Sequence, residues 1–179
     1  MGKYSKNKIS FLLSGQGSNL LNILKRNIFH KKLNIISIIS NNIIANEIKN
    51  FLIENNIQVR LYENRSKLET YFFNDANLIF SLGYMKNIPC NVITKFKIIN
   101  LHPSLLPTYK GLMCHKRALI NKEKFGGFSV HLVTKFLDEG KILTQTKYRI
   151  RTKKEINLIS SHKKLENDLV YSQLIKILN

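Results

Sequence analysis

Residues 100–111 read Asn-Leu-His-Pro-Ser-Leu-Leu-Pro-Thr-Tyr-Lys-Gly and follow an apolar run from Phe96 to Ile99. That run has the length and β-branched content of a buried strand. Asn100 and His102 come where the strand is expected to end. The two prolines of the stretch then predict a stiff, irregular loop, because proline fixes φ and lacks an N–H. Since open α/β sheets bind ligands outside the carboxyl ends of their strands, the stretch predicts a polar site for carbonyl chemistry.

On the N-terminal side, short apolar segments alternate with helical patterns. We expect strands at 8–14, 34–40, 57–62 and 77–82, and helices from about Leu20 onward and at 43–55, 66–74 and 89–95. In the third helix, Ser66 is expected to be the N-cap and Glu69 its capping-box partner. This alternation with short connections predicts an α/β fold with a doubly wound, mostly parallel sheet.

The C-terminal side has a different pattern. A short helix is expected at 115–122, and Gly126-Gly127 is expected to break it. Strands at 128–133 and 141–150 flank a turn at Asp138-Glu139-Gly140, which predicts an antiparallel β-ribbon added to the sheet. A helix over 153–179 closes the fold, and residues 1–179 are expected to form a single domain.

Composition places the chain among globular proteins. Hydrophobic residues make up 44% and charged residues 22% of 179 positions, and no apolar run approaches the ~20 residues of a membrane span. The N-terminus has no apolar signal region, and two cysteines give no disulfide framework. We expect a cytoplasmic protein without a membrane partner.

The formal net charge is +18. The lysines are spread along the chain beside abundant Asn and Ile, and all three residue types have A/T-rich codons, so a biased genome accounts for the composition. Aromatic residues are not interleaved with a basic cluster, as they are in many nucleic-acid sites. A solvated surface is therefore favoured over a nucleic-acid face, although a basic protein does attract anionic substrates.

Asn100, His102 and Asp138 suit the transfer of an acyl-level carbon. Attack of an amine on a carbonyl forms an oxyanion that needs a hydrogen-bond donor, which an Asn amide or a protonated imidazole supplies. A carboxylate and a histidine can manage the accompanying proton transfers. No Ser or Cys lies in a nucleophile elbow, so direct transfer is favoured over a covalent enzyme intermediate. The His, Cys and Asp spacings do not match a metal site.

A glycine turn at 15–19 (Gly-Gln-Gly-Ser-Asn) joins the first strand to the first helix. Such a turn directs backbone N–H groups and the positive end of a helix dipole at an anion. The sequence matches neither the dinucleotide pattern GxGxxG nor a P-loop. A plain strand–helix connection is the alternative interpretation of this turn.

Three stretches resemble the folate-dependent formyltransferases: 14–20 (SGQGSNL), 100–107 (NLHPSLLP), and 129–145, which begins SVHLV and contains LDEG. The similarity runs in the same order from about Ile9 to about Tyr171. It implies a Rossmann-like formyltransferase fold, and transfer of the formyl group of 10-formyltetrahydrofolate to the amine of 5-phosphoribosylglycinamide in purine biosynthesis. Small molecules are then the partners, and no metal is needed.

The resemblance also implies roles for residues. Asn100 and His102 polarise the formyl oxygen, His102 is the general acid, and Asp138 pairs with His102 and supports proton transfer through water. The positions that would hold the substrate are Gly17, Ser18 and Asn19 at the phosphate and Glu166 near the acceptor. The positions that would line the folate pocket are Met85, Lys86, Asn87 and Ile88 on one wall, and Thr134, Lys135, Phe136, Leu137 and Asp138 on the other, beside Asn100.

Some positions depart from the family pattern or have ordinary alternatives. Met113 stands where family members often have His, and Lys110 where Pro is common. The basic folate-side residue falls near Arg65 or Lys67. Glu166 could instead pair with Lys163 or Lys164 on its own helix. Three other histidines are not expected to take part in the chemistry. His131 is expected to be packed on its strand, and His30 and His162 are expected at the surface.

Other functions stay open at this point. A formyltetrahydrofolate hydrolase usually has an additional regulatory domain, and a methionyl-tRNA formyltransferase has an additional RNA-binding domain, for which this chain is short. A degenerate basic binding protein without catalysis is an alternative of another class. The residues do not decide between a monomer and a homodimer.

Overall fold

A computed structural model of the protein describes residues 7–179, which form two compact units. The first unit holds residues 7–98 and Leu178, and the second holds residues 99–177 and Asn179. The seven strands follow the order β3-β2-β1-β4-β5-β6-β7. The prediction of an α/β fold with a mostly parallel sheet and an antiparallel C-terminal strand pair is confirmed.

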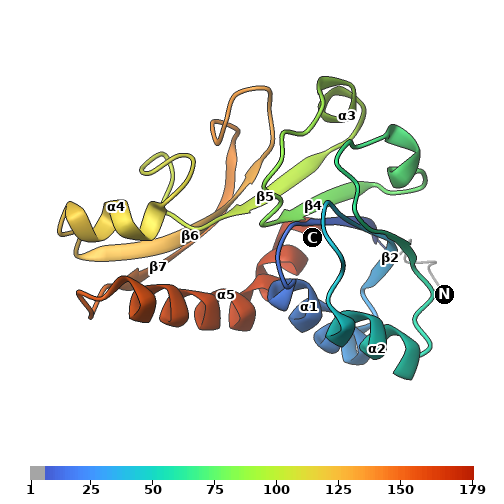
Figure 1. Ribbon diagram of the computed structural model, residues 1–179, viewed down its shortest axis with the longest axis horizontal. Coiled ribbons are helices and arrows are strands. Elements are labelled where there is room, and N and C mark those ends of the chain that lie inside the picture. The colour runs from blue at the N-terminus through green and yellow to red at the C-terminus, as the bar shows by residue number, and fades with distance from the viewer. Residues whose placement is uncertain (1–6) are drawn as a thin grey trace. The chain divides into compact units, whose positions relative to one another are not determined.

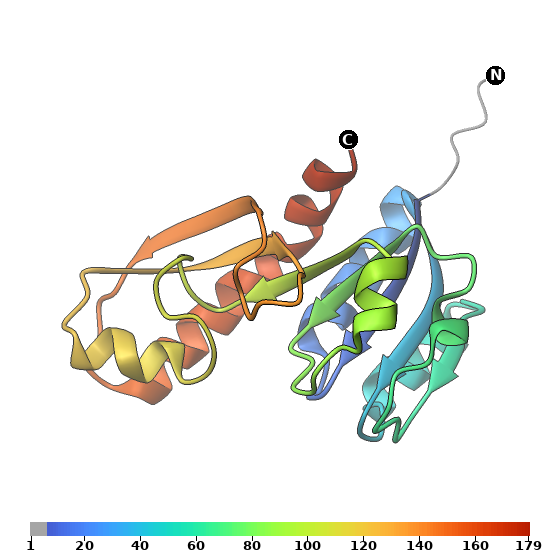
Figure 2. The same ribbon diagram turned by 90° about the horizontal axis from the view of Figure 1, so that it is seen from above.

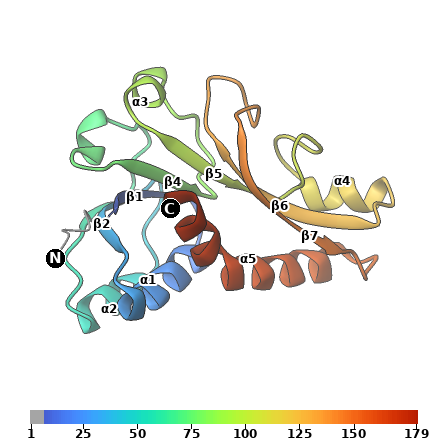
Figure 3. The ribbon, with the colours of Figure 1, turned by 180° about the vertical axis from the view of Figure 1, so that it is seen from behind.

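The first unit is a parallel α/β layer. Its strands are β1 (Asn7–Leu13), β2 (Leu33–Ser40), β3 (Arg60–Tyr62) and β4 (Leu78–Leu82), with β1 paired to both β2 and β4 and with β2 paired to β3. Helices α1 (Ser18–His30) and α2 (Asn46–Glu54) lie on one side of these strands. Helix α3 (Cys90–Lys95) and the 3₁₀ helix η1 (Thr70–Phe73) lie on the other (Figures 1 and 3).

The apolar segments of the first unit form its buried core. The last five residues of β1 and all of β4 are buried, as expected for central parallel strands covered on both faces. The apolar face of α1 (Leu20, Leu21, Ile23, Leu24) is buried as well. The buried hydroxyl of Ser37 contacts Ser10 Oγ at 2.6 Å and donates to the Phe72 carbonyl at 2.8 Å. These bonds satisfy the two buried serine hydroxyls.

The second unit is an antiparallel strand set between two helices. It contains β5 (Ile98–His102) apart from its first residue, α4 (Cys114–Ile120), β6 (Phe125–Leu132), β7 (Ile142–Arg149) and most of α5 (Glu155–Leu178). Strand β6 pairs antiparallel with both β5 and β7. Helices α4 and α5 lie on opposite faces of the β6–β7 ribbon (Figure 1). Figure 2 shows the loop after β5 in yellow-green and the β6–β7 turn in orange.

The predicted start of the sixth strand is wrong. Gly126 and Gly127 do not separate a helix from this strand but lie inside β6. A Cβ on Gly126 would meet the Tyr148 ring at 2.9 Å, and one on Gly127 would overlap the Thr146 carbonyl and Leu105. The glycines therefore allow a close approach of neighbouring groups, which is the other common reason for glycine within a strand.

The helix predicted at 66–74 is also wrong, because only η1 forms there and Ser66 caps nothing. The adjacent Phe72 and Phe73 are both buried, a pattern that a single helix face does not provide. The polar residues expected after the fifth strand lie within it, since β5 extends through Asn100 to His102. Among residues 7–179, no helix has the length and apolar character needed to cross a membrane.

Candidate active site

Asn100, His102 and Asp138 come together within the second unit. Asn100 and His102 are alternate residues of β5, so their side chains emerge on the same face of the strand. Asp138 lies in the turn that connects β6 to β7. His102 Nδ1 is 3.4 Å from Asp138 Oδ2, and both side chains are less than a tenth exposed. An amide, an imidazole and a carboxylate thus share one buried cluster.

Backbone and side-chain groups of the loop after β5 surround the His102 ring. His102 Nε2 donates to the Tyr109 carbonyl at 3.0 Å, and the Cys114 thiol lies 3.5 Å from the same nitrogen. Tyr109 has a φ of 57°, an uncommon conformation for a residue with a side chain. Burial lowers the pKa of His102, and the Tyr109 carbonyl and Asp138, which favour the charged ring, do not fully offset it.

Asp138 is a carboxylate with several polar neighbours. Its Oδ2 accepts a hydrogen bond from the Gly111 N–H at 2.8 Å, and its Oδ1 lies 3.5 Å from His131 Nε2. Burial opposes ionisation, but His131, the Gly111 N–H and His102 together hold the pKa of Asp138 below its ordinary value. Asp138 is therefore ionised at neutral pH and can stabilise positive charge on His102.

Side chains of the β-ribbon hold the loop after β5. Ser129 Oγ donates to the Ser104 carbonyl at 2.6 Å and accepts from the Leu106 N–H at 3.0 Å. Gln145 Nε2 donates to the Leu106 carbonyl at 2.8 Å and to Ser129 Oγ at 2.9 Å. These bonds satisfy loop groups that would otherwise be buried without partners.

The same loop is tied to the β6–β7 turn. In addition to the Gly111 bond, Lys110 Nζ pairs with Glu139 Oε1 at 2.9 Å. Lys110 is one of the positions where the sequence departs from the family pattern. In this chain it gives a solvent-exposed ion pair beside the Asp138 turn, and such pairs contribute little stability.

His131 is a polar neighbour that the sequence did not place at the site. It is buried, as predicted, but its Nε2 lies 3.3 Å from Asn100 Nδ2 as well as 3.5 Å from Asp138 Oδ1. In the β5–β6 register, His131 stands directly opposite Asn100. Cross-strand partners face each other, so the correct pairing of the two predicted strands would have revealed the contact.

The predicted phosphate turn lies in the first unit. Gly17 is the N-cap residue of α1 with a φ of 73°, and a Cβ there would lie 2.6 Å from Ile48 Cδ1, so both conformation and space favour glycine. Ser18 and Asn19 open the helix, whose first turn holds no acidic residue and, within the described chain, no side-chain cap. The start of α1 therefore carries no negative side chain that would repel an anion.

Most of the predicted folate-pocket residues fall in two exposed segments, one in each unit, whereas Ile88, Asn100 and Asp138 are partly buried. Met85 to Asn87 are exposed after β4, and the Met85 N–H already donates to Ser14 Oγ at 2.7 Å. The segment Thr134 to Leu137 lies in the β6–β7 turn, where Phe136 and Leu137 are 57% and 72% exposed. Exposed apolar side chains beside a buried polar cluster could cover a bound heterocycle.

Glu166 lies on α5 in a buried hydrogen-bonded chain. Its Oε1 is 2.7 Å from His162 Nε2, and His162 Nδ1 is 2.9 Å from the Tyr148 hydroxyl. The prediction that His162 lies at the surface is wrong, because the ring is fully buried. Burial and the nearby Glu166 raise the pKa of Tyr148 to about 12, so Tyr148 remains a hydroxyl donor to this histidine.

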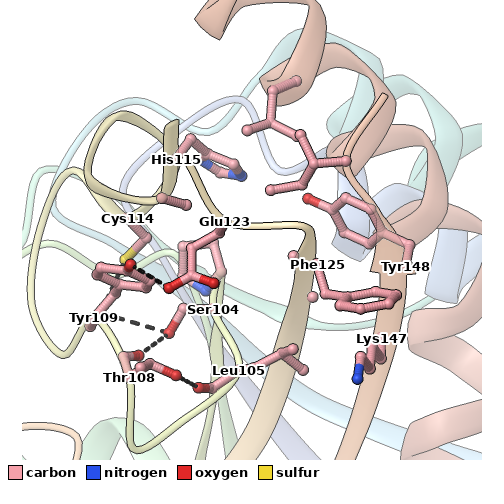
Figure 4. A pocket seen from close by; sticks show the side chains of 16 residues that line it. Ser104, Leu105, Thr108, Tyr109, Cys114, His115, Glu123, Phe125, Lys147 and Tyr148 are labelled. Carbon is pink, nitrogen blue, oxygen red and sulfur yellow. Dashed lines mark hydrogen bonds between the residues drawn. The ribbon is translucent and has the colours of Figure 1, made fainter. Parts of the chain in front are cut away.

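A cavity of about 240 Å³ lies behind the loop after β5 (Figure 4). Tyr109, Cys114 and His115 line one side of it, and Phe125 and Tyr148 line the other. The Tyr109 hydroxyl donates to Glu123 Oε1 at 2.8 Å, and this bond anchors the loop residue whose carbonyl contacts His102. The side chains that line the cavity therefore hold the loop in place, and none of Asn100, His102 and Asp138 is among them.

Among residues 7–179, no group of three or more His, Cys, Asp and Glu side chains is arranged to hold a metal ion. The cluster of Asn100, His102, His131 and Asp138 instead offers hydrogen-bond donors, one carboxylate and two imidazoles. Those groups can stabilise an oxyanion and move protons.

Comparison with known proteins gives a family match over nearly the whole chain. The sequence profile described as "Formyl transferase" matches residues 7–175. A crystal structure of phosphoribosylglycinamide formyltransferase from Anaplasma phagocytophilum is 28% identical, with a TM-score of 0.80, and the alignment covers 95% of this chain and 86% of that one.

Curated relatives include two kinds of enzyme. A phosphoribosylglycinamide formyltransferase from Haemophilus influenzae is 34% identical over 103 residues, covering 56% of this chain and 49% of the relative. A methionyl-tRNA formyltransferase from Campylobacter lari is 29% identical over 132 residues, covering 71% of this chain and 44% of the relative. The matches thus span less than half the length of both relatives.

Proposed function

Because this chain belongs to the formyl transferase family, we propose that it transfers the formyl group of 10-formyltetrahydrofolate to the amine of 5-phosphoribosylglycinamide. The observation that carries the proposal is the buried cluster of Asn100, His102 and Asp138, with His102 Nδ1 3.4 Å from Asp138 Oδ2. The likeness to phosphoribosylglycinamide formyltransferases over almost the full chain supports this acceptor.

In the proposed reaction each residue of the cluster has one task. The Asn100 amide donates a hydrogen bond to the formyl oxygen as negative charge develops there. His102 gives a proton to the leaving nitrogen of the folate as a general acid. Asp138, ionised at neutral pH, stabilises the protonated His102 and orders a water that accepts the proton lost by the attacking amine.

His102 has to exchange one hydrogen bond in order to act. Its Nε2 donates to the Tyr109 carbonyl, while Nδ1 faces Asp138. A carbonyl on one side and a carboxylate on the other both stabilise the doubly protonated ring. Burial lowers the pKa of His102, which makes the protonated ring a stronger acid. The protonated His102 is thus a ready proton donor, and the Asp138 carboxylate stabilises that protonated form against the effect of burial.

The substrate contacts are proposed from position and chemistry. Gly17, Ser18 and Asn19 bind the phosphate at the start of α1, and Glu166, whose carboxylate is paired with His162, lies near the bound acceptor. The segments Met85 to Ile88 and Thr134 to Leu137 contact the folate heterocycle. The basic chain, with a net charge of +18, favours encounter with both anionic substrates.

A spectrophotometric assay with 10-formyltetrahydrofolate tests the proposal. Deformylation should require 5-phosphoribosylglycinamide and should not occur with methionyl-tRNA as acceptor. Deformylation without any acceptor would instead identify a hydrolase, and formylation of methionyl-tRNA would identify the sister enzyme. A folded protein without turnover, but with steeply salt-dependent binding to generic nucleic acid, would favour a noncatalytic binding protein.

Mutation of His102 separates its chemical role from folding. His102→Ala should lower turnover by about 10²–10⁴-fold, as expected for loss of a general acid, and leave the circular dichroism spectrum unchanged. Lys122→Ala, at an exposed position after α4, is the matched control and should retain full turnover. Near-normal turnover in folded His102→Ala would remove His102 from the mechanism.

A further inference from the structure

The His131 ring lies between two residues of the polar cluster. It is 2% exposed, and its Nδ1 is 2.8 Å from the carbonyl of Leu132. A carbonyl only accepts, so Nδ1 carries a proton. The neutral ring then has an unshared electron pair on Nε2, and this nitrogen is 3.3 Å from Asn100 Nδ2. His131 therefore accepts a hydrogen bond from the Asn100 amide.

From this contact we propose that His131 is a positioning residue that fixes the orientation of the Asn100 amide. One N–H of Asn100 Nδ2 donates to His131 Nε2, and the second N–H remains available as a donor to the formyl oxygen. If the amide were turned over, its oxygen would face the electron pair of Nε2, and the two atoms would repel each other. The inference rests on the proposed function, since it concerns the donor that the reaction uses.

The position of Asp138 gives the same nitrogen a second, competing partner. Asp138 Oδ1 is 3.5 Å from His131 Nε2. A protonated Nε2 would donate to this carboxylate and could not accept from Asn100, so the two contacts exclude each other. When His131 is neutral and does not donate to Asp138, the Gly111 N–H at 2.8 Å and His102 at 3.4 Å still stabilise the Asp138 carboxylate. The neutral ring is therefore the form that prepares Asn100 for the reaction.

Two substitutions of His131 separate this role from packing. His131→Leu fills the space without an acceptor, whereas His131→Gln can place a carbonyl oxygen near the position of Nε2. His131→Leu should lower kcat by about 10- to 100-fold, less than the full loss of an oxyanion donor, and change KM for the formyl folate little. His131→Gln should recover most of that loss. Val130→Ala, at the adjacent buried position of β6, is the control that lowers stability and leaves kcat unchanged.

A double-mutant cycle with Asn100 makes the test decisive. If His131 acts through Asn100, then His131→Leu should cost less than about twofold in kcat when Asn100 is already Ala. Equal losses in both backgrounds would overturn the proposal, and so would an unchanged kcat in folded His131→Leu. If His131→Leu does not fold, the same cycle with His131→Gln and His131→Asn, which offer acceptors at different reach, replaces it.

Nuclear magnetic resonance gives a readout that does not depend on turnover. In the wild-type protein, ¹⁵N spectra of the imidazoles should show the Nδ1–H tautomer for His131, and the Asn100 side-chain amide should give two resolved N–H signals, one of which moves in His131→Leu. An Nε2–H tautomer, or Asn100 amide signals that do not respond to His131→Leu, would refute the contact. These spectra test the inference even if the wild-type protein fails the formyl-transfer assay.

Discussion

His115 should make the protein lose stability in mild acid. Its ring on α4 stacks edge-on against the buried His162 with centroids 4.5 Å apart, and within the described chain its buried Nε2 has no hydrogen-bond partner. Burial, reinforced by repulsion from His162, lowers the pKa of His115 from 6.5 to about 4. The folded protein thus holds this ring neutral over a pH range in which the unfolded chain binds a proton.

The sign and size of the effect follow from linkage. The contribution of neutral His115 is fully present above pH 6.5 and is lost as the pH falls toward 4. With these two values, the free energy of unfolding at pH 5 is about 2 kcal/mol below its value at pH 8. Partial exposure of the ring to solvent reduces the expected loss to about 1–2 kcal/mol.

The assay is urea unfolding at pH 8, 6.5 and 5 for wild type and His115→Leu, which cannot titrate. The variant should lose about 1–2 kcal/mol less than wild type between pH 8 and 5. Lys116→Gln on the same helix is the control and should follow wild type. A ¹H titration of the His115 ring should show a midpoint near 4. A midpoint near 6.5, or the same acid loss in His115→Leu, would refute the reasoning.

Two further changes test other parts of the structure. Asp138→Asn removes the charge that stabilises a protonated His102, so turnover should fall by about 10²–10⁴-fold with a smaller change in formyl-folate binding; an unaltered kcat would exclude Asp138 from proton transfer. Gly127→Ala puts a Cβ against the Thr146 carbonyl and Leu105, and should lower the free energy of unfolding by about 2 kcal/mol or more in urea titrations; a cost below about 0.5 kcal/mol would show that this close approach is not rigid.

Sequence patterns predicted the order of strands and helices because hydrophobic periodicity is a local property. The apolar runs at β1, β2 and β4 and the turn at Asp138 could be read directly from the residues. The cluster of Asn100, His102 and Asp138 was expected as well, from residue chemistry at strand ends and from the resemblance. These features depend little on contacts between side chains that lie far apart in the sequence.

Features that depend on distant partners were missed. From the sequence, Gly126 and Gly127 look like the end of a helix. The structure shows instead that Tyr148 and Leu105 occupy the space that side chains at these two positions would need. His131 looks like a core residue until the β5–β6 register sets it opposite Asn100. The sequence holds both partners in each case, but only tertiary pairing reveals the contact.

The hydrogen bonds from Ser129 and Gln145 to the loop after β5 have a consequence for synthesis of the protein. The ribosome makes the Asn100–His102 segment well before it makes Gln145, whose amide donates to the Leu106 carbonyl. Until β7 has emerged, that carbonyl lacks its Gln145 donor, although Ser129 of β6 can already bond the Ser104 carbonyl and the Leu106 N–H. A nascent chain that ends before residue 142 would therefore carry the signature residues without the Gln145 bonds, so the loop after β5 is fully held only late in translation.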